Sequence, residues 1–366
     1  MPLLLDAPNL GEREKKKLLE CLESTYVSTA GPSVPEFEER FARFLDAPAA
    51  VAVQSGTAAL HMALAELNIG PGDEVILPAL SFVATANPVL YTGATPVLVD
   101  VDPETWNLDI RKVEEAITPR TKAVMPVHLY GNPCDMDALC GLCEDRGIPL
   151  LEDATESLGA TWRGKATGTL GEFGCFSFNG NKLITTGGGG MFVARDLERA
   201  RHVKFLVNQA REASKGYFHP ELGYNYRMTN LEASLGLAQL ERIHEFLEAK
   251  KRFAAIYQEV LKGLEGVALQ KELPQGESAW WLPSMVTDRL PIPELQEALR
   301  QQGIPTRRIF CPLHSFPYLK QYAPRPCAEA EHIYECGLSL PASTANDDES
   351  VRRAAEIFRD ILKKGR

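Results

Sequence analysis

Between about residues 48 and 195 the sequence alternates short apolar runs with amphipathic stretches of helical spacing. The apolar runs are rich in β-branched residues and nearly continuous in apolar character, as in strands buried on both faces of a sheet. Seven runs are expected to be strands: Ala49–Val53, Glu74–Leu77, Pro96–Val99, Ala123–Val127, Ile148–Leu151, Cys175–Phe178 and Met191–Ala194. This alternation predicts an α/β fold with a mostly parallel seven-stranded sheet sandwiched by helices.

Helices are expected between the first five runs and before the sheet. The predicted helices are Pro35–Leu45, the stretch that carries Leu60, Leu64 and Leu67 on one face, Ser81–Tyr91 with Pro88 as an irregularity, Asp109–Ile117 and Asp135–Asp145. Ligands of such sheets bind outside the carboxyl ends of the strands. Ser55, Ser81, Asp153 and Lys182 all follow predicted strands, so we expect them to converge on one site.

After residue 225 the pattern changes from alternating strands and helices to longer helical stretches. Thr229–Glu232 has the spacing of a capping box and begins a helical stretch that extends to about Leu261. The sequence leaves open whether this stretch is one helix or is interrupted. Beyond it we predict a strand at Ala279–Thr287 and helices at Pro293–Gln302 and Glu349–Lys364. The sequence therefore predicts a large domain over residues 1–240 and a smaller C-terminal α+β domain over residues 241–366.

The charge balance limits the partners of this protein. Its formal net charge is −10 and its pI is near 5.4, which argues against binding to nucleic acid or to an anionic membrane, since both rely on basic patches. The N-terminal sequence MPLLLDAPNL is too short and too acidic for a signal peptide, and no apolar run approaches the roughly 20 residues that cross a bilayer. We therefore expect a cytoplasmic protein.

The cysteines do not predict a metal site. Cys140 and Cys143 form a C-x-x-C pair with Cys134 nearby, but no second pair or histidine stands at ligand spacing. The pair lies in a predicted amphipathic helix, so reduced and partly buried thiols are the expected state.

The sequence around Lys182 is the part of the chain that says most about its chemistry. It lies in GCFSFNGNKLITTGGGG, between a predicted strand and four glycines, and Asp153 stands upstream just beyond the apolar run Ile148–Leu151. Pyridoxal phosphate enzymes need such a pair: a lysine amine that bonds to the cofactor aldehyde, and a carboxylate that keeps the pyridinium nitrogen protonated. Alone, each residue could be a solvated loop lysine or a helix-capping aspartate.

Two other phosphate-binding loops do not fit the glycine-rich stretch. A nucleoside triphosphatase loop requires Gly-Lys-Ser/Thr, whereas here Asn181 separates the glycine from the lysine and Leu183 follows it. The run Gly187–Gly190 lacks the G-x-G-x-x-G spacing of a dinucleotide-binding turn.

Two further segments could contact a cofactor. Gln54–Thr57 ends the first predicted strand and begins a helix, so its N–H groups and hydroxyls could hold a phosphate, although an ordinary helix cap would look the same. Phe82 follows the second strand and could stack on an aromatic ring, or it could belong to the core.

Taken in order, several segments resemble the nucleotide-sugar aminotransferases of the DegT type, a family of the aspartate aminotransferase-like pyridoxal phosphate enzymes. The matching segments are SGTAAL at Ser55–Leu60, GDEVILPALSFVATAN at Gly72–Asn87, GATPVLVDVD at Gly93–Asp102, EDATESLGA at Glu152–Ala160, SFNGNKLITTGGGG at Ser177–Gly190 and GYNYRMTNLEASLGLAQL at Gly223–Leu240. The resemblance covers nearly the whole chain.

The resemblance implies a role for each matching residue. Lys182 is the catalytic lysine, Asp153 pairs with the pyridinium nitrogen, Glu156 lies near the ring hydroxyl, Phe82 stacks on the ring, Gly56, Thr57 and Ser177 contact the phosphate, and Asn225 contacts the phosphate of the neighbouring subunit's site. The last role implies a homodimer with shared sites. His314 would face the substrate, with a structural histidine as the alternative. Because arginine suits diphosphate binding, Arg227 is expected to be a substrate or interface cation, with pairing to a carboxylate as the alternative.

The resemblance also implies the reaction. An amino group passes from L-glutamate to the keto carbon of a nucleotide-linked sugar, and the match around NGNK suggests position 4 of a UDP-linked 2-acetamido-4-keto-6-deoxyhexose. Two alternatives stay open at this point: another pyridoxal phosphate reaction on the same fold, such as a lyase or desulfurase, and a non-catalytic sensor.

Overall fold

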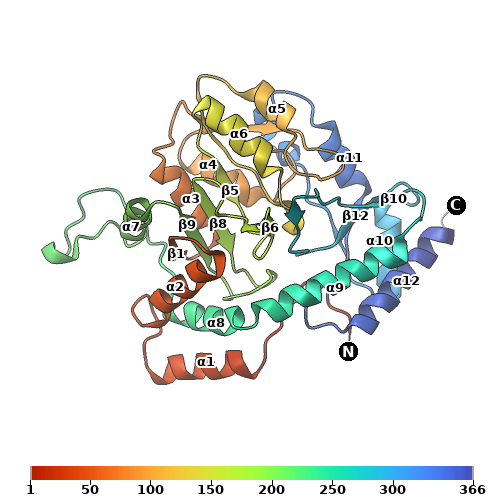
Figure 1. The fold of residues 1–366 in the computed structure, drawn as a ribbon, viewed down its shortest axis with the longest axis horizontal. Coiled ribbons are helices and arrows are strands. Elements are labelled where there is room, and N and C mark those ends of the chain that lie inside the picture. Colours follow the sequence, from red (N-terminus) through yellow and green to blue (C-terminus); the bar gives the residue numbers. More distant parts are fainter. Residues whose placement is uncertain (1, 365–366) are drawn as a thin grey trace.

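The computed structural model describes residues 2–364 (Figure 1). It contains the predicted seven-stranded sheet. Its strands, in spatial order, are β1 (Ala49–Val53), β9 (Gly190–Ala194), β8 (Phe173–Ser177), β5 (Leu151–Asp153), β4 (Thr121–Val124), β2 (Glu74–Pro78) and β3 (Thr95–Val99). Parallel bridges between Val124 and Leu150 and between Val127 and Asp153 join its two halves. Within the described chain β9 alone runs antiparallel to its neighbours, so the mostly parallel sheet is confirmed.

Helices cover both faces of this sheet, as its apolar strands require. They are α2 (Ser33–Leu45), α3 (Gly56–Glu66), α4 (Asn87–Tyr91), α5 (Ile110–Ala116), α6 (Met136–Arg146), α7 (Leu197–Leu206) and α8 (Asn230–Leu240). Alternate residues of each strand enter different cores: Val51 packs with α3 and α7, whereas Ala52 packs with Phe37 and Phe41 of α2. Helices α5 and α6 cover the other half of the second face around Val124.

A second hydrophobic core lies beyond α8. It contains an antiparallel sheet in the order β10 (Val267–Leu269), β12 (Ser284–Thr287), β14 (Gly337–Ser339), β13 (Arg307–Arg308). The helices around it are α9 (Ile243–Leu261), α10 (Ile292–Gln301), α11 (Ala328–Cys336) and α12 (Asp348–Lys364). Phe253, Leu295 and Phe358 belong to the same buried cluster. This is the predicted α+β architecture; a domain boundary at residue 240 stays a prediction.

Several element predictions need correction. The helix predicted at Ser81–Tyr91 is a 3₁₀ turn, Val83–Thr85, followed by α4, because Pro88 has no N–H and fits only the first turn of a helix. The strand predicted from Ala279 begins only at Ser284, since Trp280 has a positive φ of 50° and Pro283 cannot donate to a sheet. β5 begins three residues later than predicted, so Asp153 is its last residue.

The long helical stretch is interrupted at Arg242, whose φ of −106° and ψ of 5° separate α8 from α9. The capping box is present: the Thr229 hydroxyl accepts from the Glu232 N–H, and the Glu232 carboxylate accepts from the Thr229 N–H. A further helix, α1 (Glu12–Glu23), packs against α8 and was not predicted. Among residues 2–364, none of the helices combines the length and apolar character that crossing a bilayer requires.

Candidate active site

The carboxyl ends of the strands border a cavity of about 390 Å³. Ser55 follows β1, Ser81 follows β2, Asp153 ends β5 and Lys182 follows β8, and all four line this cavity. The predicted convergence at this edge of the sheet is therefore confirmed.

Most of the residues singled out from the sequence line the same cavity. They are Gly56, Thr57, Phe82, Asp153, Glu156, Ser177 and Lys182. Asn225, Arg227 and His314 do not line it within the described chain. Arg227 instead donates to Asn208 Oδ1 at 3.2 Å and to the Thr29 carbonyl. His314 bonds through Nε2 to Glu331 Oε1 at 2.9 Å.

Lys182 is held with its amine close to a carboxylate and an aromatic face. Its Nζ lies 3.7 Å from Glu156 Oε1 and 4.0 Å from the centre of the Trp281 ring, and the side chain is 14 % exposed. Burial lowers the pKa of Lys182, while the Glu156 and Asp153 carboxylates act in the opposite direction. A lowered pKa increases the fraction of neutral amine, which is the form that attacks a carbonyl or accepts a proton.

Glu156 links this lysine to the strained turn at Tyr130. Its Oε2 accepts from the Tyr130 N–H at 2.8 Å, while Tyr130 has a positive φ of 55°. Burial raises the pKa of Glu156, and the nearby Lys182 amine lowers it. The Tyr130 ring in turn stacks between Trp281 and Phe310, at centroid distances of 6.1 and 5.2 Å. The carboxylate therefore positions both the amine and the aromatic wall of the cavity.

Asp153 is fixed by hydroxyl donors on both carboxylate oxygens. Oδ2 accepts from Thr85 Oγ1 at 2.7 Å, and Oδ1 accepts from Thr155 Oγ1 at 2.7 Å and from the Thr155 N–H at 3.2 Å. Thr85 is held by Ser81, with 2.7 Å between their hydroxyl oxygens. These bonds fix the orientation of the carboxylate at the cavity wall.

The N-terminus of α3 forms the part of the cavity that suits an anion. Ser55 caps the helix by accepting from the Ala58 N–H at 3.0 Å, which leaves the first-turn N–H groups of Gly56 and Thr57 at the cavity. A Cβ on Gly56 would lie 2.9 Å from both Ser177 Cβ and Thr155 Cγ2. Glycine is thus required for the helix end to approach these two hydroxyl-bearing residues.

Phe82 is an aromatic side chain that remains 54 % exposed although it lies at the cavity. Its ring centroid is 5.6 Å from that of Phe310, with an angle of 46° between the planes. A flat aromatic ligand could pack against this exposed ring. Lysine, carboxylate, helix N-terminus and exposed phenylalanine together fit the aldehyde, ring nitrogen, phosphate and ring face of pyridoxal phosphate.

Among the lining residues that sequence reasoning missed are Asn179, Asn181, Trp281, Arg307 and Phe310. The last three come from the C-terminal part of the chain, more than 90 residues beyond Lys182, and no spacing links them to it. Only the two asparagines, next to the lysine in NGNK, carried a local signal. Arg307 is already paired with Asp6, through contacts of 2.6 and 3.1 Å.

The cysteines do not form a metal centre in this structure. Cys134, Cys140 and Cys143 are free thiols, and burial raises the pKa of Cys143 to about 12. Residues 2–364 contain no cluster of three or more His, Cys, Asp or Glu side chains that could hold a metal ion.

The fold and the cavity define the class of protein: a pyridoxal phosphate-dependent enzyme with the aspartate aminotransferase-like fold. Residues 8–359 match the sequence profile of the DegT/DnrJ/EryC1/StrS aminotransferase family. The chain belongs to this family, which confirms the resemblance found in the sequence, and it is a nucleotide-sugar aminotransferase.

Three known proteins illustrate the similarity. GDP-perosamine synthase of Caulobacter vibrioides is 41% identical over 363 residues, with 97% of each chain covered. UDP-N-acetyl-3-dehydro-alpha-D-glucosamine 3-aminotransferase of Acidithiobacillus ferrooxidans is 38% identical over 317 residues, covering 85% of this chain and 84% of its own. A Streptococcus pneumoniae protein assigned as a sugar aminotransferase, solved in its PLP form, superposes with a TM-score of 0.95 at 28% identity, with both chains fully covered.

Two alternatives were left open by the sequence, another pyridoxal phosphate reaction and a non-catalytic sensor. Membership of an aminotransferase family decides against both. The structure also gives a reason against a desulfurase that uses Cys175. This thiol is fully buried in β8, and burial raises its pKa well above the usual value, whereas a reactive cysteine must be accessible as a thiolate.

Proposed function

We propose that this enzyme moves an amino group from L-glutamate to carbon 4 of a nucleotide-linked 4-keto-6-deoxyhexose, with Lys182 as the catalytic base. The observation that carries the proposal is the presence of the Lys182 amine and the Asp153 carboxylate in one cavity. The bound cofactor supplies an electron sink for the carbon that carries the amino group.

The chain's own residues have distinct tasks in this proposal. With the cofactor bound, Lys182 would move a proton at the amine-bearing carbon, and its lowered pKa favours the neutral form that accepts this proton. Asp153, held by Thr85 and Thr155, keeps the ring nitrogen protonated. Glu156 orients the lysine amine. It would also lie near the ring hydroxyl of the bound cofactor, as the family resemblance implies.

Different residues would hold the phosphate and the ring. Gly56 and Thr57 offer the N–H groups of the α3 N-terminus, and Ser177 adds a hydroxyl at the same place. Phe82 would stack on the ring.

Replacement of Lys182 by alanine should abolish the visible absorbance of the purified protein and the covalent adduct trapped by borohydride. A reducible adduct in that variant would refute the assignment.

A homodimer with shared sites is part of the proposal. Asn225 does not line the cavity of its own chain, and the segment after α7 extends away from the sheet (Figure 1), with Tyr217 86 % exposed and Leu222 also exposed. Exposed apolar side chains on an extended segment are typical of a subunit contact. Asn225, and with it Arg227, would then reach the partner's site, whereas His314 would reach substrate only by leaving Glu331.

Mixed dimers test this arrangement. A Lys182→Ala chain and an Asn225→Glu chain should each be inactive or strongly impaired as homodimers. In a mixed dimer one of the two sites draws both residues from intact copies, so activity should return up to about half that of the wild-type dimer. If subunits exchange and no activity returns, Asn225 does not act across an interface.

The nucleotide distinguishes two candidate substrates. The sequence favours a UDP-linked 2-acetamido-4-keto-6-deoxyhexose, and a UDP-sugar is also named for the relative from Acidithiobacillus ferrooxidans. The relative at 41% identity, from Caulobacter vibrioides, is named for a GDP-linked amino sugar, which favours a GDP-linked 4-keto-6-deoxyhexose as the second candidate. We also propose that the enzyme is located in the cytoplasm.

A half-reaction assay separates the candidates. The protein is first converted to its amine form with L-glutamate, and UDP-, GDP- and dTDP-linked 4-keto-6-deoxyhexoses are then added one at a time. The correct substrate restores the absorbance of the aldehyde form, and the Lys182→Ala variant serves as the blank. Restoration by a 3-keto sugar but by none of the 4-keto sugars would refute position 4.

A further inference from the structure

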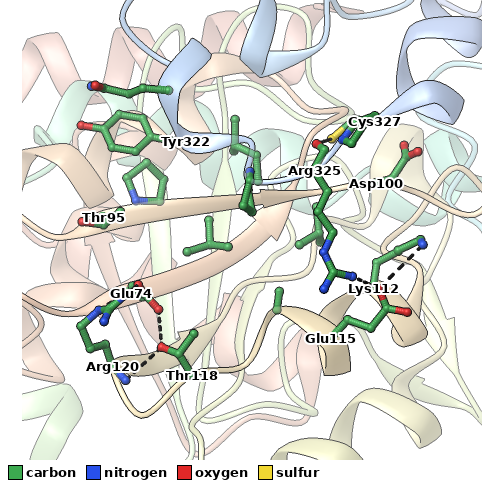
Figure 2. Close-up of a pocket in the computed structure, with 18 residues that line it drawn as sticks. Glu74, Thr95, Asp100, Lys112, Glu115, Thr118, Arg120, Tyr322, Arg325 and Cys327 are labelled. Atoms are coloured by element: carbon green, nitrogen blue, oxygen red, sulfur yellow. Dashed lines mark hydrogen bonds and ion pairs between the residues drawn. The ribbon is translucent and has the colours of Figure 1, made fainter.

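The Lys182 amine lies where water can solvate a positive charge only in part. Its side chain is 14 % exposed. The cations of a second cavity, at the edge strand β3, differ in this respect (Figure 2): Lys112, Arg120 and Arg325 are 44, 64 and 58 % exposed, and each pairs with a carboxylate. When Lys182 holds a proton, groups of the protein must therefore stabilise most of its charge.

Several groups of the protein act on this amine. Burial lowers the pKa of Lys182, while the Glu156, Asp153 and Asp6 carboxylates favour the ammonium form. Glu156 Oε1 lies 3.7 Å from Nζ, and the centre of the Trp281 ring lies 4.0 Å from it. The face of an indole ring is negative, so at this distance it attracts an ammonium group far more than a neutral amine.

Trp281 is fixed at several points. Its indole Nε1–H donates to the Asn181 carbonyl at 2.7 Å, and its own carbonyl accepts from Lys250 Nζ at 2.6 Å. The ring stacks with Tyr130, with 6.1 Å between the centroids and 21° between the planes, and the residue is 2 % exposed. The hydrogen bonds and the packing thus hold the ring face in place beside the amine.

The same indole is connected to both ends of Lys182. Asn181 directly precedes Lys182, so the bond from Trp281 Nε1 to the Asn181 carbonyl fixes the backbone of the lysine loop, while the ring face lies against the amine. A lysine has a long flexible stem between these two points. Contacts at both ends limit the positions that Nζ can take.

We infer that Trp281 is a positioning residue of the amino transfer: its indole face holds the Lys182 amine beside Glu156 and stabilises it while it carries the proton. The inference rests on the proposed function, in which Lys182 moves a proton at the amine-bearing carbon. Burial favours the neutral amine that accepts this proton, whereas Trp281 and Glu156 favour the ammonium that holds it. These opposed effects keep both forms accessible, as a group that takes up and releases a proton requires.

The test changes the charge of the ring face and keeps its shape. Tryptophan analogues with one, two or three fluorine atoms, placed at position 281, draw electron density from the face. The protein is loaded with pyridoxamine phosphate, which leaves Lys182 as a free amine, and is labelled with acetic anhydride. Because only the neutral amine reacts, mass spectrometry of the peptide that contains Lys182 reports how much of it is neutral. At a fixed pH below the midpoint of labelling, the rate should rise with each fluorine, by about threefold or more across the series.

Trp162 is the matched control, because it is buried but does not line the catalytic cavity of the described chain. The same analogues at position 162 should leave the labelling of Lys182 unchanged. An unchanged rate with fluorine at position 281 would overturn the inference. Labelling needs no turnover, so its outcome does not depend on whether L-glutamate and a keto sugar are the substrates.

A natural substitution gives a second readout. Trp281→Phe keeps a smaller aromatic face but removes the N–H group that bonds to Asn181. The rate constant at saturating L-glutamate should fall about tenfold or more while KM stays nearly the same, because the contact with the lysine acts during proton transfer and not in substrate binding. An unchanged rate constant, with or without a raised KM, would contradict a role through Lys182.

Discussion

Lys250 is a lysine buried in the protein interior with hydrogen-bond partners for only two protons. It lies on α9, is 3 % exposed, and its Nζ donates to the Trp281 carbonyl at 2.6 Å and to the Ala342 carbonyl at 2.5 Å. A neutral amine has two N–H donors, so these two acceptors satisfy it, whereas an ammonium carries a third proton. Burial lowers the pKa of Lys250 to about 7, while the Asp6 carboxylate acts in the opposite direction.

The stability of the protein should therefore depend on pH through this group. Its pKa is lower in the folded chain than in the unfolded chain, so burying the charged form costs most below about pH 7. That cost is relieved as the pH rises from about 7 toward the unfolded value near 10.5. Between pH 6 and pH 9 the folded state should gain about 3 kcal/mol from Lys250, as roughly two pKa units at about 1.4 kcal/mol each require.

Replacement by methionine removes this dependence and keeps much of the side-chain volume. For a chain of 366 residues, about 3 kcal/mol corresponds to a shift of roughly 4 °C in Tm. We expect Lys250→Met to be less stable than wild type at pH 9, where two carbonyls lose their donor, and the Tm difference to shrink by about 4 °C at pH 6.

Thermal unfolding of both proteins at pH 6, 7, 8 and 9 measures this difference, and other titrating groups cancel in it. Lys251→Met is the matched control: this neighbouring lysine is 57 % exposed and pairs with Glu277 at 3.4 Å, so its replacement should give a difference that is nearly constant with pH. A constant difference for Lys250→Met as well would refute a neutral amine at neutral pH.

Three further outcomes are expected from the site. Asp153→Asn should keep the fold and bound cofactor but lose most activity, because a neutral amide does not hold the ring nitrogen protonated; near wild-type turnover in a coupled glutamate assay would contradict this. Gly56→Val should weaken cofactor binding at least tenfold in an absorbance titration, since its side chain would overlap Ser177, and unchanged affinity would show that the helix end can move. Glu152→Gln should lower Tm by several degrees, because this buried carboxylate accepts three backbone N–H bonds and one from His128; an unchanged Tm would show that an amide satisfies the same donors.

The sheet could be predicted because the local sequence of each strand is enough to identify it. Strands buried on both faces must be almost wholly apolar, so runs such as Glu74–Pro78 stand out from their surroundings. Errors arose where tertiary contacts decide the backbone. The chain before Ser284 has the composition of a strand, yet Trp280 takes a positive φ so that Trp281 can pack on Tyr130 and donate to the Asn181 carbonyl. Neither requirement is visible in the local sequence.

The catalytic half of the site was predictable for a related reason. Parallel strands place their carboxyl ends at one edge, so polar residues that directly follow apolar runs must meet there, as Ser55, Asp153 and Lys182 do. Only some of the hydrogen bonds that orient Asp153 come from residues near it in the sequence. Thr155 is two residues away, but Thr85 is 68 residues away. Even so, both threonines come from segments that the sheet topology already brings together.

The part of the cavity where we expect substrate to bind depends on contacts that no periodic pattern in the sequence indicates. Asp6 bonds to Asn181 at 3.2 Å and to Arg307 at 2.6 Å, and so joins the N-terminal segment, the lysine loop and the second core at the cavity. Each of these contacts can change without altering the sheet or the catalytic pair, because none of them belongs to a strand end that the fold requires. Relatives with the same chemistry can thus differ in sugar and nucleotide. We therefore expect substrate choice in this enzyme to respond first to substitutions around Asp6, Asn181 and Arg307.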